Sequence, residues 1–92
     1  MMVQLYATLR PLAGRRRVRL DLGETTVGEV LDELVSKYPD LHDALLDAEG
    51  RVRRYVAIMV EGRDIRHLAG LETPVAEDSE MDIFPPVAGG GG

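Results

Sequence analysis

The hydrophobic period of the chain changes near residue 25, and this change limits the folds open to it. Before that point, apolar residues alternate with polar ones over residues 3–9 and 18–22, which is the pattern of half-buried strands. After it, apolar residues recur at three- and four-residue spacing, which indicates an amphipathic helix. These residues are Val27, Val30, Leu31, Leu34 and Tyr38. The order predicts a hairpin followed by a helix that needs a sheet on its apolar face.

Local signals mark the ends of these elements. Pro11 and Gly14 predict the turn between the two strands. Thr26 and Glu29 fit a capping box, in which the threonine oxygen and the glutamate carboxylate accept from free N–H groups at the start of a helix. Pro39 is expected to stop the helix. A short second helix or turn is expected over residues 41–46.

Further strands are expected to complete the sheet. Residues 55–60 are all apolar, which is typical of a strand that lies centrally in a sheet or presents its outer face to a partner. A turn then precedes a short segment from residue 64, and residues 81–84 form the last candidate strand. The fold class is therefore predicted as α+β, with a mixed sheet wrapped around one main helix.

Length and composition restrict the kinds of site. The chain has 92 residues, which suits one domain over residues 1–86, followed by a flexible glycine tail over residues 87–92. The absence of cysteine excludes disulfides, iron–sulfur clusters, thiolate zinc sites and cysteine nucleophiles. His42 and His67 have no second ligand at helical or hairpin spacing, so no metal site is expected.

Charge and hydropathy indicate which partners and which cellular location to expect. The net charge of −5 repels nucleic acid at long range, so no nucleic-acid partner is expected. The sequence shows no signal-peptide pattern and no apolar run near the ~20 residues that span a bilayer, so we expect no membrane association and a cytoplasmic location. Arg15, Arg16 and Arg17 are interpreted as solvated surface in the hairpin turn, with an acidic partner or RNA as the alternatives.

The chain ends in four glycines, Gly89 to Gly92, after Pro85-Pro86. Glycine has the largest ordering entropy, so this segment is expected to be flexible. The residues from Pro85 onward reach roughly 25–29 Å when extended, at ~3.3–3.6 Å each. The four glycines have no Cβ atoms, so they fit a channel too narrow for side chains. A flexible linker or a cloning remnant is the alternative interpretation.

The reactive group of such a tail is its terminal carboxylate. This group is ionised at neutral pH and is a poor acyl donor, so it needs activation, most simply by ATP as an acyl-adenylate. Sulfide or a persulfide then displaces AMP on the way to a thiocarboxylate, or a lysine amine displaces AMP to leave an isopeptide bond. The chemistry belongs to an enzyme on the partner's side, and the chain itself is expected to be a carrier and not an enzyme.

Several motifs together resemble the ThiS/MoaD family of ubiquitin-like sulfur carriers, over nearly the whole length of the chain. The most specific is the end, Ile83-Phe84-Pro85-Pro86-Val87-Ala88-Gly89-Gly90. The others are Thr8-Leu9-Arg10-Pro11 with Gly14, Thr26-Val27-Gly28-Glu29-Val30-Leu31, Tyr38-Pro39-Asp40-Leu41, Val60-Glu61-Gly62-Arg63-Asp64-Ile65-Arg66 and Gly70-Leu71-Glu72-Thr73-Pro74. The resemblance implies a β-grasp fold, nearest to the branch that carries sulfur for cysteine synthesis (CysO type) or to the MoaD type.

The resemblance also implies partners and residue roles. An activating enzyme adenylates the terminal glycine with ATP, and a synthase accepts the sulfur; the carrier binds no cofactor. Family members usually end at the position of Gly90, so the acceptor here is Gly92, or Gly90 if a metalloprotease trims the tail. Val87, Ala88, Gly89, Gly90 and Gly91 are then the residues that the partner recognises. The alternatives are a modifier conjugated to lysines and the small subunit of a molybdopterin synthase.

A partner surface is expected beside the tail. One face of the strand at residues 55–60 should pack on Leu31 and Leu34, and the other should be exposed with Phe84. The alternation does not decide which set faces outward. We assign the surface to Phe84, Pro85, Ile58 and Val60.

Overall fold

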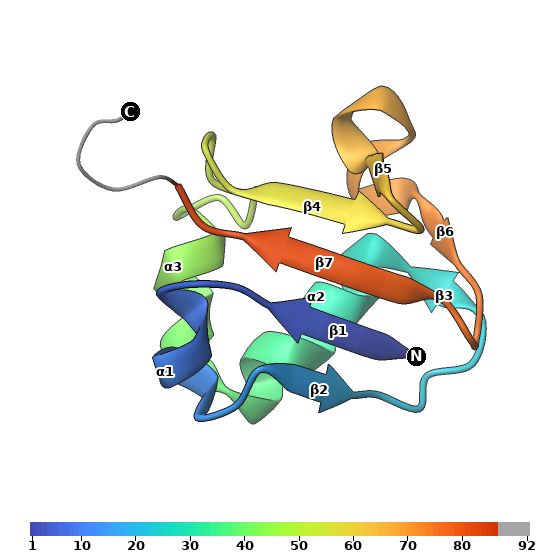
Figure 1. Cartoon of the computed structure of the whole chain (residues 1–92). Helices are drawn as coiled ribbons and strands as arrows, with labels where there is room; N and C mark the ends of the chain where they lie inside the picture. Colours follow the sequence, from blue (N-terminus) through green and yellow to red (C-terminus); the bar gives the residue numbers. More distant parts are fainter. Residues whose placement is uncertain (87–92) are drawn as a thin grey trace.

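The main sheet of the protein has five strands, and the first and last strands of the chain lie side by side in it (Figure 1). The computed structural model describes residues 1–86. Across the sheet the order is β2-β1-β7-β4-β5, with β1 parallel to β7 and the other neighbours antiparallel. The strands are β1 (Met2–Leu5), β2 (Arg17–Arg19), β4 (Ala57–Val60), β5 (Arg63–Asp64) and β7 (Glu80–Phe84). The predicted mixed sheet is confirmed.

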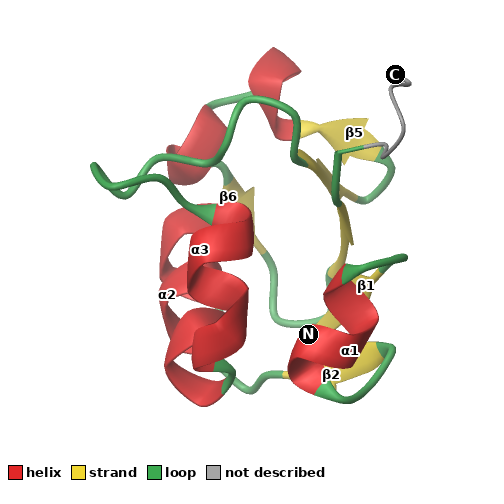
Figure 2. Cartoon of the chain, turned by 90° about the vertical axis from the view of Figure 1, so that its left-hand side faces the viewer, coloured by secondary structure: helices red, strands yellow, loops and turns green. Residues whose placement is uncertain are grey.

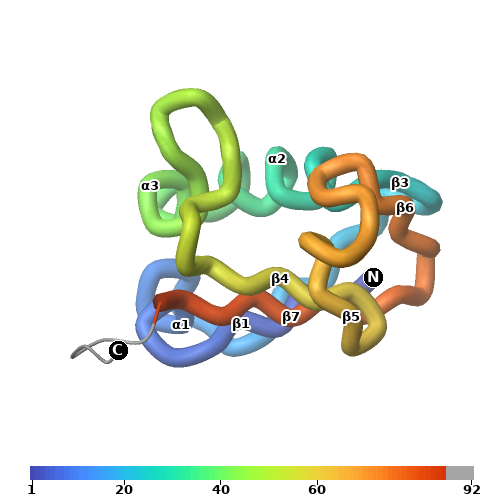
Figure 3. Tube along the Cα trace, turned by 90° about the horizontal axis from the view of Figure 1, so that it is seen from above, coloured from blue at the N-terminus to red at the C-terminus, as the bar shows by residue number. Residues whose placement is uncertain are grey.

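One long helix, α2 (Val27–Lys37), covers a single face of this sheet, as Figures 2 and 3 show. The Thr26 hydroxyl oxygen accepts from the Glu29 N–H at 3.3 Å, which is the predicted N-cap. The Glu29 carboxylate does not complete the box as expected, since it accepts from the Thr25 hydroxyl at 2.6 Å. Thr25–Thr26 also forms β3, which pairs with β6 (Pro74–Val75) in a separate two-stranded ribbon.

Short helical segments fill the connections. The segment after α2 forms η1 (Pro39–Leu41) and α3 (His42–Leu45), as predicted. Two further turns, η2 (Ile65–His67) and η3 (Gly70–Glu72), link β5 to β6. Within the described part of the chain, no helix is long and apolar enough to cross a membrane.

The connection between β1 and β2 corrects the sequence prediction. It contains a helix, α1 (Leu9–Ala13), where we expected the first strand to run to Leu9 and Pro11 to form a turn. The strand ends early because Ala7 adopts a φ of 50°, outside the extended region. Pro11 is tolerated because it lies in the first turn, where no intrahelical N–H bond is lost. Gly14 ends the helix with a φ of 72°.

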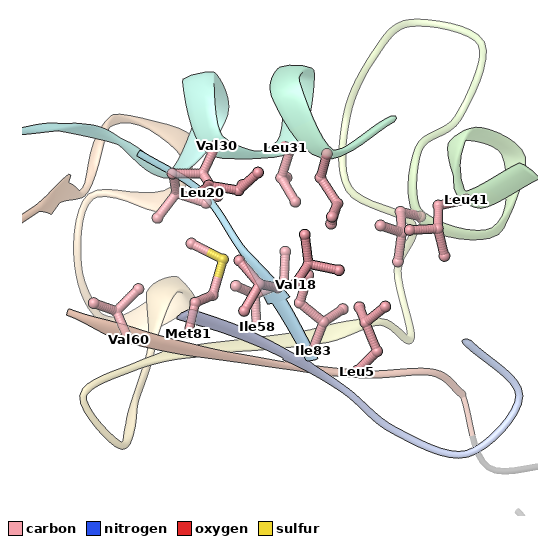
Figure 4. Close-up of a cluster of buried hydrophobic side chains, with 14 of the residues drawn as sticks. Leu5, Val18, Leu20, Val30, Leu31, Leu41, Ile58, Val60, Met81 and Ile83 are labelled. Carbon is pink, nitrogen blue, oxygen red and sulfur yellow. The ribbon is translucent and has the colours of Figure 1, made fainter. Parts of the chain in front are cut away.

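The core lies between the sheet and α2 (Figure 4). Side chains of β1, β4 and β7 that point toward the helix are almost fully buried: Val3, Leu5, Ile58, Val60, Met81 and Ile83. They meet Val27, Val30, Leu31 and Leu34 of α2. Each such side chain contributes roughly 1.5–3 kcal/mol when it is removed from water. The apolar residues of the alternating strands and those of the amphipathic helix therefore pack together in one core.

The assignment of Ile58 and Val60 to a partner surface is wrong. Their exposed fractions are 1% and 7%, and Figure 4 shows both pointing from the sheet toward the helix. Because side chains alternate along a strand, Ala57 and Met59 occupy the outer face instead, and both are half-buried. Tyr55 lies before β4 in a turn and is 70% exposed.

Candidate functional site

The glycine tail follows directly from β7, a strand held on both sides. In the register of the sheet, Ile83 lies opposite Leu5 of β1, and Phe84 lies opposite Ala57 of β4. The strand leads to Pro85 and Pro86, where the described residues end. The body of the protein thus fixes the position of the two prolines that precede the tail.

An aromatic stack marks the root of the tail on the outer face of the sheet. The rings of Tyr6 and Phe84 lie 4.2 Å apart at an angle of 18°. The Arg10 guanidinium lies over the Tyr6 ring, 5.6 Å from its centroid, in a cation–π geometry. Arg10 is held there because its Nε donates to the Leu5 carbonyl at 2.9 Å. Helix α1 therefore places the positive charge of Arg10 beside the residues from which the tail begins.

The Tyr6 phenol is anchored at its far end. Its hydroxyl donates to Asp82 Oδ1 at 2.9 Å, and its backbone N–H donates to the Ile83 carbonyl at 3.2 Å. The hydrogen bond to Asp82 raises the pKa of Tyr6, with desolvation and the Asp82 charge adding to the shift and Arg10 opposing it. The phenol therefore stays protonated as a donor. We call Tyr6, Arg10, Asp82 and Phe84 the tail-root cluster.

The outer face around this cluster is partly apolar. Met2 and Gln4 of β1 are half-buried there, as are Ala57 and Met59 of β4. Phe84 and Pro85, which we predicted as partner-facing, are also half-buried. The residues partly exposed beside Phe84 and Pro85 are thus the outward ones of β1 and β4, and not Ile58 and Val60.

Most of the predicted site lies outside the described residues. Val87, Ala88 and Gly89 to Gly92 belong to that part, so their predicted roles stay predictions. Among residues 1–86, no group of three potential metal ligands comes together. His42 Nδ1 lies 2.9 Å from Asp43 Oδ1, a pair on the protein surface.

Three members of the tail-root cluster, Tyr6, Arg10 and Asp82, were not found from the sequence. Asp82 occupies an outward position of β7, and Tyr6, the residue after β1, falls in the outward phase of the alternation in that part of the sequence, which is a signal for a shared face. That signal becomes specific only when β1 is known to lie parallel to β7. The sequence gives no such signal for Arg10, because this residue lies on α1, a helix too short to show a hydrophobic period.

The sequence matches one protein family and several characterised proteins over almost its whole length. The model of the ThiS family matches residues 3–90. The small archaeal modifier protein 3 of Haloferax volcanii is 34% identical over 90 residues, which cover 96% of each chain. The sulfur carrier protein CysO of Mycobacterium tuberculosis is 33% identical over 90 residues, again covering 96% of each chain.

A solved structure agrees with these relatives. In the BexX/CysO complex of Amycolatopsis orientalis, a chain superposes with a TM-score of 0.84 at 29% identity, covering 97% of this chain and 98% of that one. The expected ubiquitin-like β-grasp fold is confirmed by this likeness and by the mixed sheet around α2.

Proposed function

Because the chain belongs to the ThiS family of small sulfur carriers and ubiquitin-like modifiers, we propose that it carries sulfur as a thiocarboxylate on its C-terminal glycine. The body serves as a recognition module, and the tail is the part that reacts. The chain acts as a co-substrate of an ATP-dependent activating enzyme. The sulfur goes to a biosynthetic synthase, of the cysteine or the molybdopterin type.

The proposed chemistry has two steps. The terminal carboxylate of Gly92 attacks the α-phosphate of ATP, which forms an acyl-adenylate and releases pyrophosphate. Sulfide then attacks the acyl carbon and displaces AMP, which leaves the thiocarboxylate. Where the donor is a persulfide, its terminal sulfur displaces AMP to form an acyl disulfide, and a second thiol of the donor enzyme cleaves this bond, forming a new disulfide and releasing the thiocarboxylate. Adenylation is needed because a free carboxylate is ionised at neutral pH and resists attack.

The observation that carries the proposal is the position of the tail root. Phe84 ends a central strand, opposite Ala57 on one side and stacked on Tyr6. Because this root is already ordered in the free protein, a partner that docks on it does not have to order it, which lowers the entropy cost of docking. The absence of cysteine from the sequence fits a carrier whose sulfur comes from outside.

The expected partners are an adenylating enzyme, a sulfur-accepting synthase and, where the tail is trimmed, a metalloprotease. The CysO protein of Amycolatopsis orientalis has been solved in complex with BexX, which supports a carrier that works by docking on other proteins. The family model matches the chain up to Gly90, so trimming to that residue would give the second candidate acceptor.

Conjugation to lysines is a second candidate function, favoured by the likeness to a small archaeal modifier protein. It begins with the same adenylate and ends in an isopeptide bond. A glycine remnant on lysines of other proteins, found by mass spectrometry after proteolysis, would support it. A role as the small subunit of a molybdopterin synthase stays a prediction, and stable copurification with a larger subunit would support it.

Reconstitution tests the proposal. The chain, its activating enzyme, ATP and a sulfur source are mixed, and pyrophosphate release and thiocarboxylate are measured. A variant that lacks residues 89–92 should keep its circular dichroism spectrum and melting temperature and should lose both products. A truncated protein that is still adenylated would refute the proposal. Arg63→Gln, on β5, is a matched control that should react like the wild type.

A further inference from the structure

The two edges of the sheet differ in how their backbone groups are used. At the β4–β5 edge, Arg66 Nη2 donates to the carbonyl oxygens of Arg54 and Val56 at 2.6 and 2.7 Å. These bonds occupy acceptors in the segment that leads into β4, next to the part of β4 that does not pair with β5. At the opposite edge, β2 is the outermost strand of the sheet, as Figure 1 shows at the lower margin.

The hydrogen-bond pattern shows which groups of β2 are open. The Arg16 carbonyl accepts from the Leu5 N–H, and the Leu20 N–H donates to the Met1 carbonyl. In an antiparallel ladder every second residue bonds to a given neighbour, so Arg17 and Arg19 direct their N–H and C=O groups away from β1. Within residues 1–86, these groups have no hydrogen-bond partner.

Unpaired arginines surround this edge. Arg15, Arg16, Arg17 and Arg19 are all exposed, and none forms an ion pair with another described residue. They make up four of the 11 basic residues in a protein of net charge −5. Arg19 also lines a hollow with the acidic residues Asp21, Glu77, Asp78 and Glu80, so the excess of positive charge lies toward Arg15, Arg16 and Arg17. Two copies of β2 placed side by side would bring these arginines together, so like-charge repulsion opposes self-association through this edge.

We propose that the open edge of β2 binds an extended acidic segment of a partner protein by strand addition. The partner backbone pairs with Arg17 and Arg19, and its aspartate or glutamate side chains on the outer face meet the arginines. Pairing through the backbone distinguishes this partner from RNA or an anionic membrane, which offer charge without a matching row of N–H and C=O groups. A partner held by charge alone would leave the outward N–H and C=O groups of β2 without hydrogen-bond partners.

A capped peptide that alternates valine and glutamate is a direct probe. We expect it to shift the backbone amide signals of Arg17 and Arg19 and to slow their hydrogen exchange. The comparison peptide has the same sequence and charge, with N-methyl groups on the amides that face the protein. Binding of the N-methylated peptide with equal affinity would overturn the proposal, because it would show attraction by charge alone.

Variants separate the edge from the rest of the surface. Arg17→Gln with Arg19→Gln should weaken peptide binding by about fivefold or more, from the loss of two charge pairs. Arg63→Gln, an exposed arginine on the opposite edge, should leave the affinity unchanged. Amide exchange of Val3 and Val18, which pair across β1 and β2, reports whether the double variant keeps the strand.

Two further outcomes are decisive. Oligouridylate, or vesicles that contain phosphatidylserine, would overturn the proposal if either bound the same arginines more tightly than the peptide. Deletion of residues 87–92 should leave peptide binding intact, because the edge lies on β2. This result would hold whether or not the tail carries sulfur, and loss of binding on deletion would contradict the proposal.

Discussion

The Tyr6 hydroxyl donates a hydrogen bond to the Asp82 carboxylate across 2.9 Å, although the two residues are 76 positions apart in the chain. The bond is possible because β1 and β7 run parallel and in register, so that Gln4 lies opposite Asp82. It fixes the Tyr6 ring on Phe84, next to the prolines where the tail begins. The first strand of the chain thus supports the root of its last segment.

The stability of the fold should fall in alkaline solution through Tyr6. Because its pKa is raised above the ordinary value of about 10, the folded protein keeps a proton that the unfolded chain has lost. The contribution is complete below pH 10 and disappears as the pH rises through the folded-state pKa. Urea unfolding at several pH values should show a steeper alkaline loss for the wild type than for Tyr6→Phe. Equal slopes would contradict the assignment.

Removal of the Phe84 ring should weaken the tail root. Phe84→Ala loses the stack on Tyr6, worth about 0.5–1.5 kcal/mol beyond the buried area, and should lower activation by the partner more than it lowers stability. Phe84→Tyr keeps the ring and is the control. The rates of adenylation and the melting temperatures of both variants decide the question. Wild-type adenylation by a folded Phe84→Ala protein would exclude a role for the ring.

Ile58 and Met59 should respond differently to truncation because they lie on opposite faces of β4. Ile58→Ala leaves a cavity in the core and should reduce the free energy of unfolding by about 2–5 kcal/mol. Met59→Ala, on the outer face, should cost about 1 kcal/mol or less. Denaturant titration measures both. A larger loss for Met59→Ala would reverse the assignment of the two faces.

Thr26 should contribute to stability as the cap of α2. Thr26→Ala removes the acceptor of the Glu29 N–H and should cost about 0.5–2 kcal/mol. Thr26→Ser retains the hydroxyl and should recover most of this loss. Thermal unfolding followed by circular dichroism provides the comparison, and an alanine variant as stable as the wild type would show that the cap contributes nothing.

The main elements of the fold could be predicted because their signals are local. The alternation around Val3 and Val18 and the helical spacing from Val27 to Leu34 record which side chains face the core. Helix α1 could not be predicted, since its five residues are too few to show a period and Pro11 suggested a turn. The β3–β6 pair joins Thr25 to Val75, and no local pattern records a pairing so distant.

The site was predicted in part for the same reason. Phe84 and Pro85 follow from the motif before the glycines, and the structure places them at the root of the tail. The run from residue 55 to 60 is apolar at every position, so its pattern gives no phase, and Ile58 and Val60 were assigned to the wrong face. Tyr6 joins the cluster only through the parallel pairing of β1 with β7.

The most direct test of sulfur transport is the intact mass of the protein from its own cells, combined with a thiocarboxylate-selective label. The label is needed because exchange of oxygen for sulfur nearly matches the mass change from oxidation of one of the four methionines. If the tail carries sulfur, the labelled chain ends at Gly92, or at Gly90 after trimming. A chain that never takes the label, during growth on a sulfur source that requires biosynthesis, would contradict it.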